Sequence, residues 1–161
     1  MNASQTVAPG GLFTFGGANT TLYQGSINWV NVIQPKFWLI TLGGMTASGK
    51  TIDLKGELRA AIDTGTTLIG GPNDIVQAFY AAIPGSAPIK SQNGFYSYPC
   101  DTQVGATMQF GNQKYTIAEE AMAVQQIGAG YCMGAFFGLG NTAGNEAQWI
   151  IGTNFLSSVY T

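Results

Sequence analysis

The run Ala61-Ile62-Asp63-Thr64-Gly65-Thr66-Thr67 contains the residues of this sequence best suited to acid–base chemistry. An apolar stretch that reaches Asp-Thr-Gly-Thr predicts a strand ending in a tight turn, because glycine lets the backbone approach closely. In such a turn the Asp63 carboxylate accepts hydrogen bonds from backbone N–H groups and from the Thr66 hydroxyl, which favours its ionised form. Taken alone, the four-residue pattern favours an ordinary β-turn with an Asx-type hydrogen bond.

A carboxylate in this turn gains a catalytic use when a second carboxylate lies beside it. Two carboxylates at such a short distance from each other share one proton. The charged partner can then activate a water as general base, while the protonated partner polarises a carbonyl. Asp-Thr-Gly occurs once in the sequence, since Asp53 precedes Leu, Asp74 precedes Ile and Asp101 precedes Thr-Gln. The chain is therefore expected to supply one half of such a pair.

The absence of histidine from the sequence removes several other chemistries. A Ser-His-Asp triad and a Cys-His pair cannot form within this chain. Zinc held by histidine is excluded as well. The residues predict no metal site and no cofactor, so chemistry is expected from carboxylates, hydroxyls, lysines or backbone dipoles.

The composition predicts one folded domain. Of 161 residues, 45% are apolar and only 9% are charged, with a net charge of -2. That balance is the reverse of a disordered chain. No basic run marks a nucleic-acid site, and no apolar stretch is long enough for a membrane span. So low a charge is typical of proteins that work outside the cell or in acid, and equally of a piece with a large face that meets another domain.

Two cysteines and two sequons bear on the compartment. An even cysteine count without a CxxC spacing favours a disulfide between Cys100 and Cys132, with two buried free thiols as the alternative. Asn2-Ala3-Ser4 and Asn19-Thr20-Thr21 are candidate glycosylation sites. Met1 is followed by polar residues, so no signal peptide is predicted in this chain.

Short apolar runs separated by glycine predict an all-β sandwich or barrel-like architecture. One helix is predicted over 72–83, because Pro72 suits a first turn, Asp74 suits the positive helix end and Pro84 stops it. A shorter helix is predicted after Gly152. Strands are expected over 11–17, 26–32, 37–42, 58–62, 107–110, 114–117 and 131–137.

The order of motifs resembles the C-terminal lobe of pepsin-like aspartic endopeptidases, peptidase family A1, and is similar to fungal members. The resemblance covers nearly the whole chain. It rests on Phe13-Thr14-Phe15-Gly16-Gly17, Tyr23-Gln24-Gly25-Ser26-Ile27-Asn28-Trp29-Val30, Phe37-Trp38-Leu39-Ile40, Ala61 to Leu68, Gly71-Pro72, the Cys100 and Cys132 positions, and Trp149-Ile150-Ile151-Gly152 with Phe155-Leu156.

The resemblance implies one lobe of a bilobal acid protease fold, and a secreted or vacuolar parent that cleaves polypeptides. It implies that Asp63 is a catalytic aspartate and that Thr64 joins the hydrogen-bond lattice linking two catalytic loops. Gly65 and Thr66 would bind the substrate backbone, and Thr67 would flank the cleft. The three tryptophans are expected in the core rather than in a subsite; they are Trp29, Trp38 and Trp149.

Several departures from the family suggest that residues 1–161 lack the N-terminal lobe and the last strand or strands. An intact member carries the Asp-Thr/Ser-Gly motif twice, and its chain continues beyond the stretch like Val159-Tyr160-Thr161. Thr153 replaces a common Asp. The isolated chain is thus expected to be inactive, with an exposed apolar face. Two alternatives stay open: a homodimer with one Asp63 from each copy, and a non-catalytic pseudo-peptidase that binds peptides or proteins.

Overall fold

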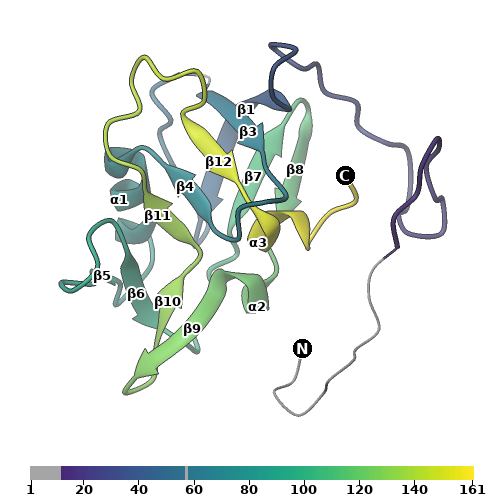
Figure 1. The fold of residues 1–161 in the computed structure, drawn as a ribbon. Helices are drawn as coiled ribbons and strands as arrows, with labels where there is room; N and C mark the ends of the chain where they lie inside the picture. Colours follow the sequence, from purple (N-terminus) through teal and green to yellow (C-terminus); the bar gives the residue numbers. More distant parts are fainter. Residues whose placement is uncertain (1–11, 57) are drawn as a thin grey trace.

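The computed structural model describes residues 12–56 and 58–161, and within them strands dominate over three short helices (Figure 1). The strands are β1 Leu39–Ala47, β2 Lys50–Thr51, β3 Leu58–Ile62, β4 Ile69–Gly71, β5 Ala87–Pro88, β6 Tyr96–Pro99, β7 Thr107–Phe110, β8 Gln113–Thr116, β9 Ala123–Gly128, β10 Tyr131–Gly134, β11 Phe136–Gly138 and β12 Trp149–Ile151. The helices are α1 Asn73–Ala81, α2 Glu119–Met122 and α3 Thr153–Leu156. The expectation of an all-β lobe is confirmed.

The larger sheet has the order β11-β4-β12-β3-β1-β7-β8, and β2 pairs with β1 outside that path. β12 lies between β3 and β4, parallel to the first and antiparallel to the second. The chain segment 63–68 therefore leaves β3, passes the end of β12 and returns as β4. A smaller sheet has the order β5-β6-β10-β9 and lies at the other end of the molecule (Figure 1).

The core fills the space between the large sheet and α1. Ile75, Val76 and Phe79 face inward from α1 and are buried, as the spacing predicts for one helix face. Phe136 lies between Phe79 and Trp149, with ring centroids 4.2 Å and 6.1 Å away. The helix predicted over 72–83 is thereby confirmed, with observed bounds Asn73–Ala81.

Tyr80 shows how this apolar core accommodates a polar atom. Its hydroxyl donates to the Phe136 carbonyl at 2.8 Å and accepts from the Phe136 N–H at 3.1 Å. A buried hydroxyl without partners would be costly, so this pair of bonds fixes α1 against the backbone of β11. Burial also raises the pKa of Tyr80 far above its ordinary value.

Residues 12–38 form an arm that runs outside the two sheets before β1 begins (Figure 1). The strands predicted over 11–17 and 26–32 are wrong for the described residues: 12–32 contain no strand. An isolated bridge between Gln34 and Leu39 is the one ladder contact of this arm among the described residues. A strand pattern becomes a strand only when a neighbouring strand supplies backbone hydrogen-bond partners, and among the described residues no strand pairs with 12–32.

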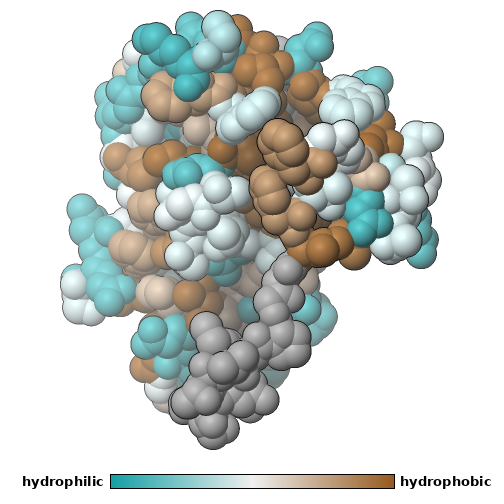
Figure 2. Space-filling model, turned by 45° about the vertical axis from the view of Figure 1, so that its right-hand side comes forward, coloured by the Kyte–Doolittle hydropathy of each residue, from teal (hydrophilic) through white to brown (hydrophobic). Residues whose placement is uncertain are grey.

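The arm is rich in exposed apolar side chains. Phe15 is 94% exposed, Trp29 85% and Trp38 73%. The expectation of a core position is therefore wrong for Trp29 and Trp38, and it is confirmed for Trp149, which is fully buried. Figure 2 turns this side forward and shows brown, hydrophobic surface among the polar side chains. Large exposed apolar patches on folded domains are typical of surfaces that contact another molecule.

The smaller sheet is cross-linked by a disulfide. Cys100 follows β6 and Cys132 lies in β10, and the two sulfurs are bonded across a sequence separation of 32 residues. This agrees with the expectation from the even cysteine count. Among the described residues, no helix has the length and apolar character needed to cross a membrane.

Candidate active site

Asp63 is the first residue of the turn between β3 and β4. Its backbone N–H donates to the carbonyl of Ile151, the last residue of β12, at 3.0 Å. The turn is closed where the Thr66 N–H donates to the Asp63 carbonyl at 3.3 Å. The main chain at Asp63 is thus held by its neighbour strand before any side chain takes part.

The Asp63 carboxylate accepts one hydrogen bond on each oxygen. The Gly65 N–H donates to Oδ1 at 2.9 Å, and the Thr66 hydroxyl donates to Oδ2 at 2.5 Å. The Thr66 hydroxyl, with a smaller effect of the Gly65 N–H, holds the pKa of Asp63 below its usual range. This is the hydrogen-bond pattern predicted from the sequence.

The start of α3 holds the rest of the turn. Helix N-termini leave N–H groups without partners, and here three of them reach the carbonyls of the turn. Gly152 N–H donates to Leu68 at 3.1 Å, Thr153 N–H to Thr66 at 2.8 Å and Asn154 N–H to Thr67 at 2.9 Å. A helix that packs on the core therefore fixes the carbonyl side of the turn.

Gly152 makes this close approach feasible. A Cβ atom at this position would overlap the carbonyl oxygens of Thr66 and Leu68. Glycine is the residue that removes this clash. The sequence drew attention to the two isoleucines followed by Gly152, but which carbonyls they approach is visible only in the fold.

The outer face of the turn is open. Thr64, Gly65 and Thr67 are exposed, whereas Asp63 and Thr66 are half-buried. The Thr64 hydroxyl makes no hydrogen bond within residues 12–56 and 58–161, so the lattice role expected for it stays a prediction. An exposed turn with a fixed carboxylate at its base can present that carboxylate and the Thr64 and Thr67 hydroxyls to a bound chain.

The remaining sequence-predicted residues lie away from this turn. Asn19 belongs to the arm, and the disulfide of Cys100 and Cys132 belongs to the smaller sheet. Asn2 lies outside the described residues. Within those residues no group of three His, Cys, Asp or Glu side chains is placed to hold a metal ion.

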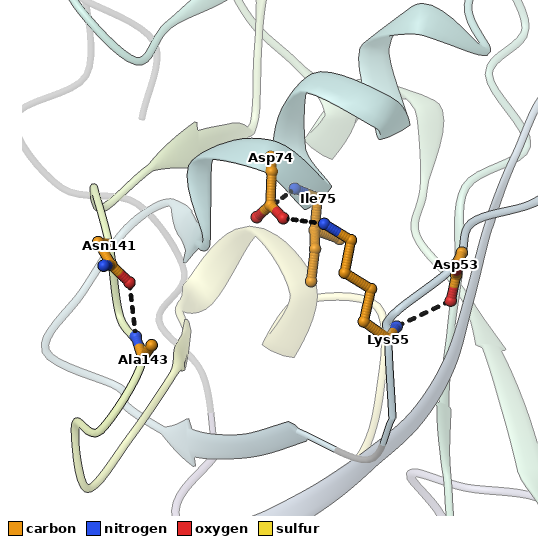
Figure 3. Close-up of polar contacts among 6 residues, drawn as sticks. All are labelled: Asp53, Lys55, Asp74, Ile75, Asn141 and Ala143. Atoms are coloured by element: carbon orange, nitrogen blue, oxygen red, sulfur yellow. Dashed lines mark hydrogen bonds and ion pairs between the residues drawn. The ribbon is translucent and has the colours of Figure 1, made fainter.

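A hollow of about 460 Å³ lies between the loop after β2, the start of α1 and the segment 140–148. Lys55 and Asp74 form an ion pair at its edge, and the Asp53 side chain accepts from the Lys55 backbone N–H at 2.8 Å (Figure 3). The hydrogen bond from Lys55 lowers the pKa of Asp74. Sequence reasoning gave Asp74 a helix-end role and did not predict its partner. The pair belongs to the frame of the molecule, since Asp63 does not line this hollow.

Comparisons with known proteins identify the family to which the whole chain is similar. The model of a family described as eukaryotic aspartyl protease matches residues 1–161. The chain is 36% identical to major aspartyl peptidase 1 of Cryptococcus neoformans var. grubii, over 99% of this chain and 35% of that protein. It is 34% identical to an aspartic protease of Phaffia rhodozyma, over 91% and 36%. It is 33% identical to cathepsin D of Homo sapiens, over 95% and 38%.

The share of each relative that this chain covers is also informative. Nearly all of this chain aligns, but it spans only 35% to 38% of the length of these three relatives. More than half of each relative therefore has no counterpart among the 161 residues.

Proposed function

Since the chain belongs to the eukaryotic aspartyl protease family, we propose that it forms the C-terminal lobe of an aspartic endopeptidase and that Asp63 is one of its two catalytic aspartates. The observation that carries this proposal is the exposed turn in which Gly65 and Thr66 hold both oxygens of the Asp63 carboxylate. These two bonds, one on each oxygen, fix the orientation of the half-buried carboxylate.

The second carboxylate would come from another lobe. At acid pH the two carboxyl groups share a proton, because two charges so close repel each other. The ionised member takes a proton from water as the water oxygen attacks the peptide carbonyl carbon. The protonated member donates a hydrogen bond to the carbonyl oxygen. The tetrahedral intermediate then collapses, the C–N bond breaks, and the amine leaves with a proton from the pair.

The residues after Asp63 would bind the substrate backbone. We propose that Gly65 and Thr66 offer main-chain hydrogen bonds to an extended peptide and that Thr67 flanks the cleft. The exposure of Gly65 and Thr67 supports these roles. Thr64 would contact the equivalent turn of the other lobe. These roles place one side of the cleft on this chain and the other side on its partner.

The arm supports the proposal of a missing partner. Its apolar side chains, among them Phe13, Phe15 and Trp29, are exposed without a neighbouring strand among the described residues. A lobe that covers them would bury apolar surface, which stabilises association by roughly 25 cal/mol per Å² of area removed from water. We propose that the chain alone is inactive, and that a second copy is the alternative source of the partner carboxylate.

The disulfide and the relatives support a secretory route for the parent protein. Disulfides persist in oxidising compartments, and Cys100 and Cys132 are joined. An extracellular or vacuolar location, where acid favours the chemistry above, fits both.

A covalent fusion tests the proposed function. The chain would be joined behind the remaining N-terminal part of the Cryptococcus neoformans relative and assayed on denatured globin at acid pH. The proposal predicts cleavage that falls about 10²–10⁴-fold in Asp63→Asn, the range that acid–base groups supply. Asp53→Asn, a surface change of the same chemistry, serves as the matched control. Equal activity of Asp63→Asn and the control, in folded fusions, would refute a catalytic role.

A further inference from the structure

The arm carries a turn that contains the sequon Asn19-Thr20-Thr21. Leu22 N–H donates to the Asn19 carbonyl at 3.1 Å, which makes residues 19–22 a turn. Asn19 is half-buried, while Thr20 and Thr21 are exposed. The turn is anchored at one end, where the Asn19 N–H donates to the Tyr160 hydroxyl at 2.9 Å.

The Asn19 side chain is held by the third residue of its sequon. The Thr21 N–H and the Thr21 hydroxyl both donate to Asn19 Oδ1, at 3.0 Å and 2.7 Å. Both lone pairs of Oδ1 are thus occupied. The amide nitrogen, Nδ2, makes no hydrogen bond within residues 12–56 and 58–161 and is the atom left for reaction.

We infer that Asn19 is an acceptor of an N-linked glycan, donated by a lipid-linked oligosaccharide diphosphate. In the transfer, Nδ2 forms a bond to the anomeric carbon of the first sugar, the bond from that carbon to the diphosphate oxygen breaks, and one Nδ2 proton leaves to a base. The two hydrogen bonds at Oδ1 stabilise the negative charge that gathers on that oxygen as the proton leaves. The product is a bulky, hydrated group on an exposed turn.

A second turn of this protein serves as a comparison, because it lacks a hydroxyl at the position of Thr21. The Ala143 N–H donates to Asn141 Oδ1 at 3.0 Å, the same Asx-type bond that Thr21 makes to Asn19 (Figure 3). Alanine has no hydroxyl, so the Asn141 turn has the backbone bond without the second donor. The remaining sequon begins at Asn2, outside the described residues. Asn19 is the position at which sequon, exposed turn and hydroxyl contact coincide.

The inference rests on the secretory route proposed above, and the experiment supplies that route. The full chain with Asn2→Gln would be expressed behind a secretory leader in a eukaryotic host and recovered from medium and lysed cells together. A peptide N-glycosidase in heavy-oxygen water converts each glycosylated Asn to labelled Asp, which peptide mass spectrometry locates. The Cys100–Cys132 disulfide, read on the same sample, shows that the chain entered the oxidising compartment.

Labelled Asp is expected at position 19 in the Asn2→Gln chain and in the matched control Thr20→Ala. It is expected to be lost in Thr21→Ala, which keeps Asn19 but lacks the hydroxyl. Unlabelled Asn19 in disulfide-bonded chain, or equal labelling in Thr21→Ala, would overturn the inference. Neither result depends on peptidase activity, so a failure here is separate from a failure of the proposed function.

Discussion

At the scale of single residues, hydrogen-bond donors from its own turn, rather than a distant charge, fix the orientation of the Asp63 carboxylate and lower its pKa. The Thr66 hydroxyl and the Gly65 N–H come from residues two and three positions further along the chain. For that reason the contact could be predicted from the sequence Asp-Thr-Gly-Thr. The hydrogen bonds from the three N–H groups at the start of α3 could not be predicted, because these donors lie 84 to 87 residues further along the chain than the carbonyls they reach.

Replacing Thr66 with valine tests the electrostatic part of this arrangement. The Thr66 hydroxyl is the larger cause of the lowered pKa of Asp63, so its removal raises that pKa. The ionised carboxylate then appears only at higher pH, and the acid limb of kcat/KM in the assembled enzyme moves to higher pH. A pH–rate profile measures this. Thr116→Val, the same change on β8, should leave the limb in place, and an equal shift in both variants would contradict the assignment.

Gly152→Ala tests the packing of the turn against α3. The added Cβ would overlap the carbonyl oxygens of Thr66 and Leu68, so the turn must move. Overpacking of this kind costs about 1–3 kcal/mol. Denaturant unfolding should show that loss, and inhibitor binding at Asp63 should weaken with it. Gly17→Ala has open space and is expected to change stability by less than about 0.5 kcal/mol. Equal stability of the two variants would rule out the packing role.

At the scale of elements, the sequence predicts well where the pattern is local. α1 has a starting proline, an early aspartate and a one-sided apolar face, and it lies where expected. β7 and the β7–β8 hairpin follow from alternating residues around a glycine turn. β4 was not predicted, because Ile-Gly-Gly has weak strand propensity. β9 was missed too, since its residues are mostly exposed and lack alternation.

The smaller sheet depends on its cross-link. Changing both cysteines to serine frees a loop that the chain-entropy model values at roughly 3–4 kcal/mol for this separation. We expect the free energy of unfolding to fall by that amount. Reducing the wild-type disulfide should lower it equally, which separates the cross-link from the serine side chains. A loss below about 1 kcal/mol in both cases would contradict this.

The Lys55–Asp74 pair links the loop after β2 to α1, and its effect should vary with pH. The bond from Lys55 places the folded-state pKa of Asp74 below its unfolded value. The pair therefore stabilises the fold above the ordinary Asp pKa, and the effect disappears as pH falls through the lowered value. Both groups are largely exposed, so the effect is small.

Thermal unfolding across pH measures this contribution. Lys55→Met should have a lower Tm than wild type near neutral pH, and the two should converge in strong acid. Lys50→Met is the matched control, because Lys50 makes no ion pair within the described part of the chain. A difference in Tm that stays constant into strong acid would argue against the ion pair as its cause.

At the scale of the whole molecule, the exposed arm and the single Asp63 both support the proposal that a second lobe is needed. The segment 26–32 alternates like a strand yet pairs with no strand among the described residues; Trp29 and Val32 are exposed, while Val30 packs partly against the core. The prediction of strands there was wrong for the described residues. An alternating pattern indicates that a segment can form a strand, but it does not indicate whether a partner strand is present. The Asp63 turn has its own internal hydrogen bonds but holds one carboxylate where the proposed chemistry needs two.

The most direct test is the initial rate of peptide cleavage at acid pH by the purified 161-residue chain, measured over a wide range of chain concentrations. No turnover above that of Asp63→Asn is expected at any concentration. Asp63-dependent turnover that rises linearly with concentration would contradict it, because one lobe would then suffice. A rate that rises with the square of concentration would also contradict it, and would show that a second copy supplies the missing carboxylate.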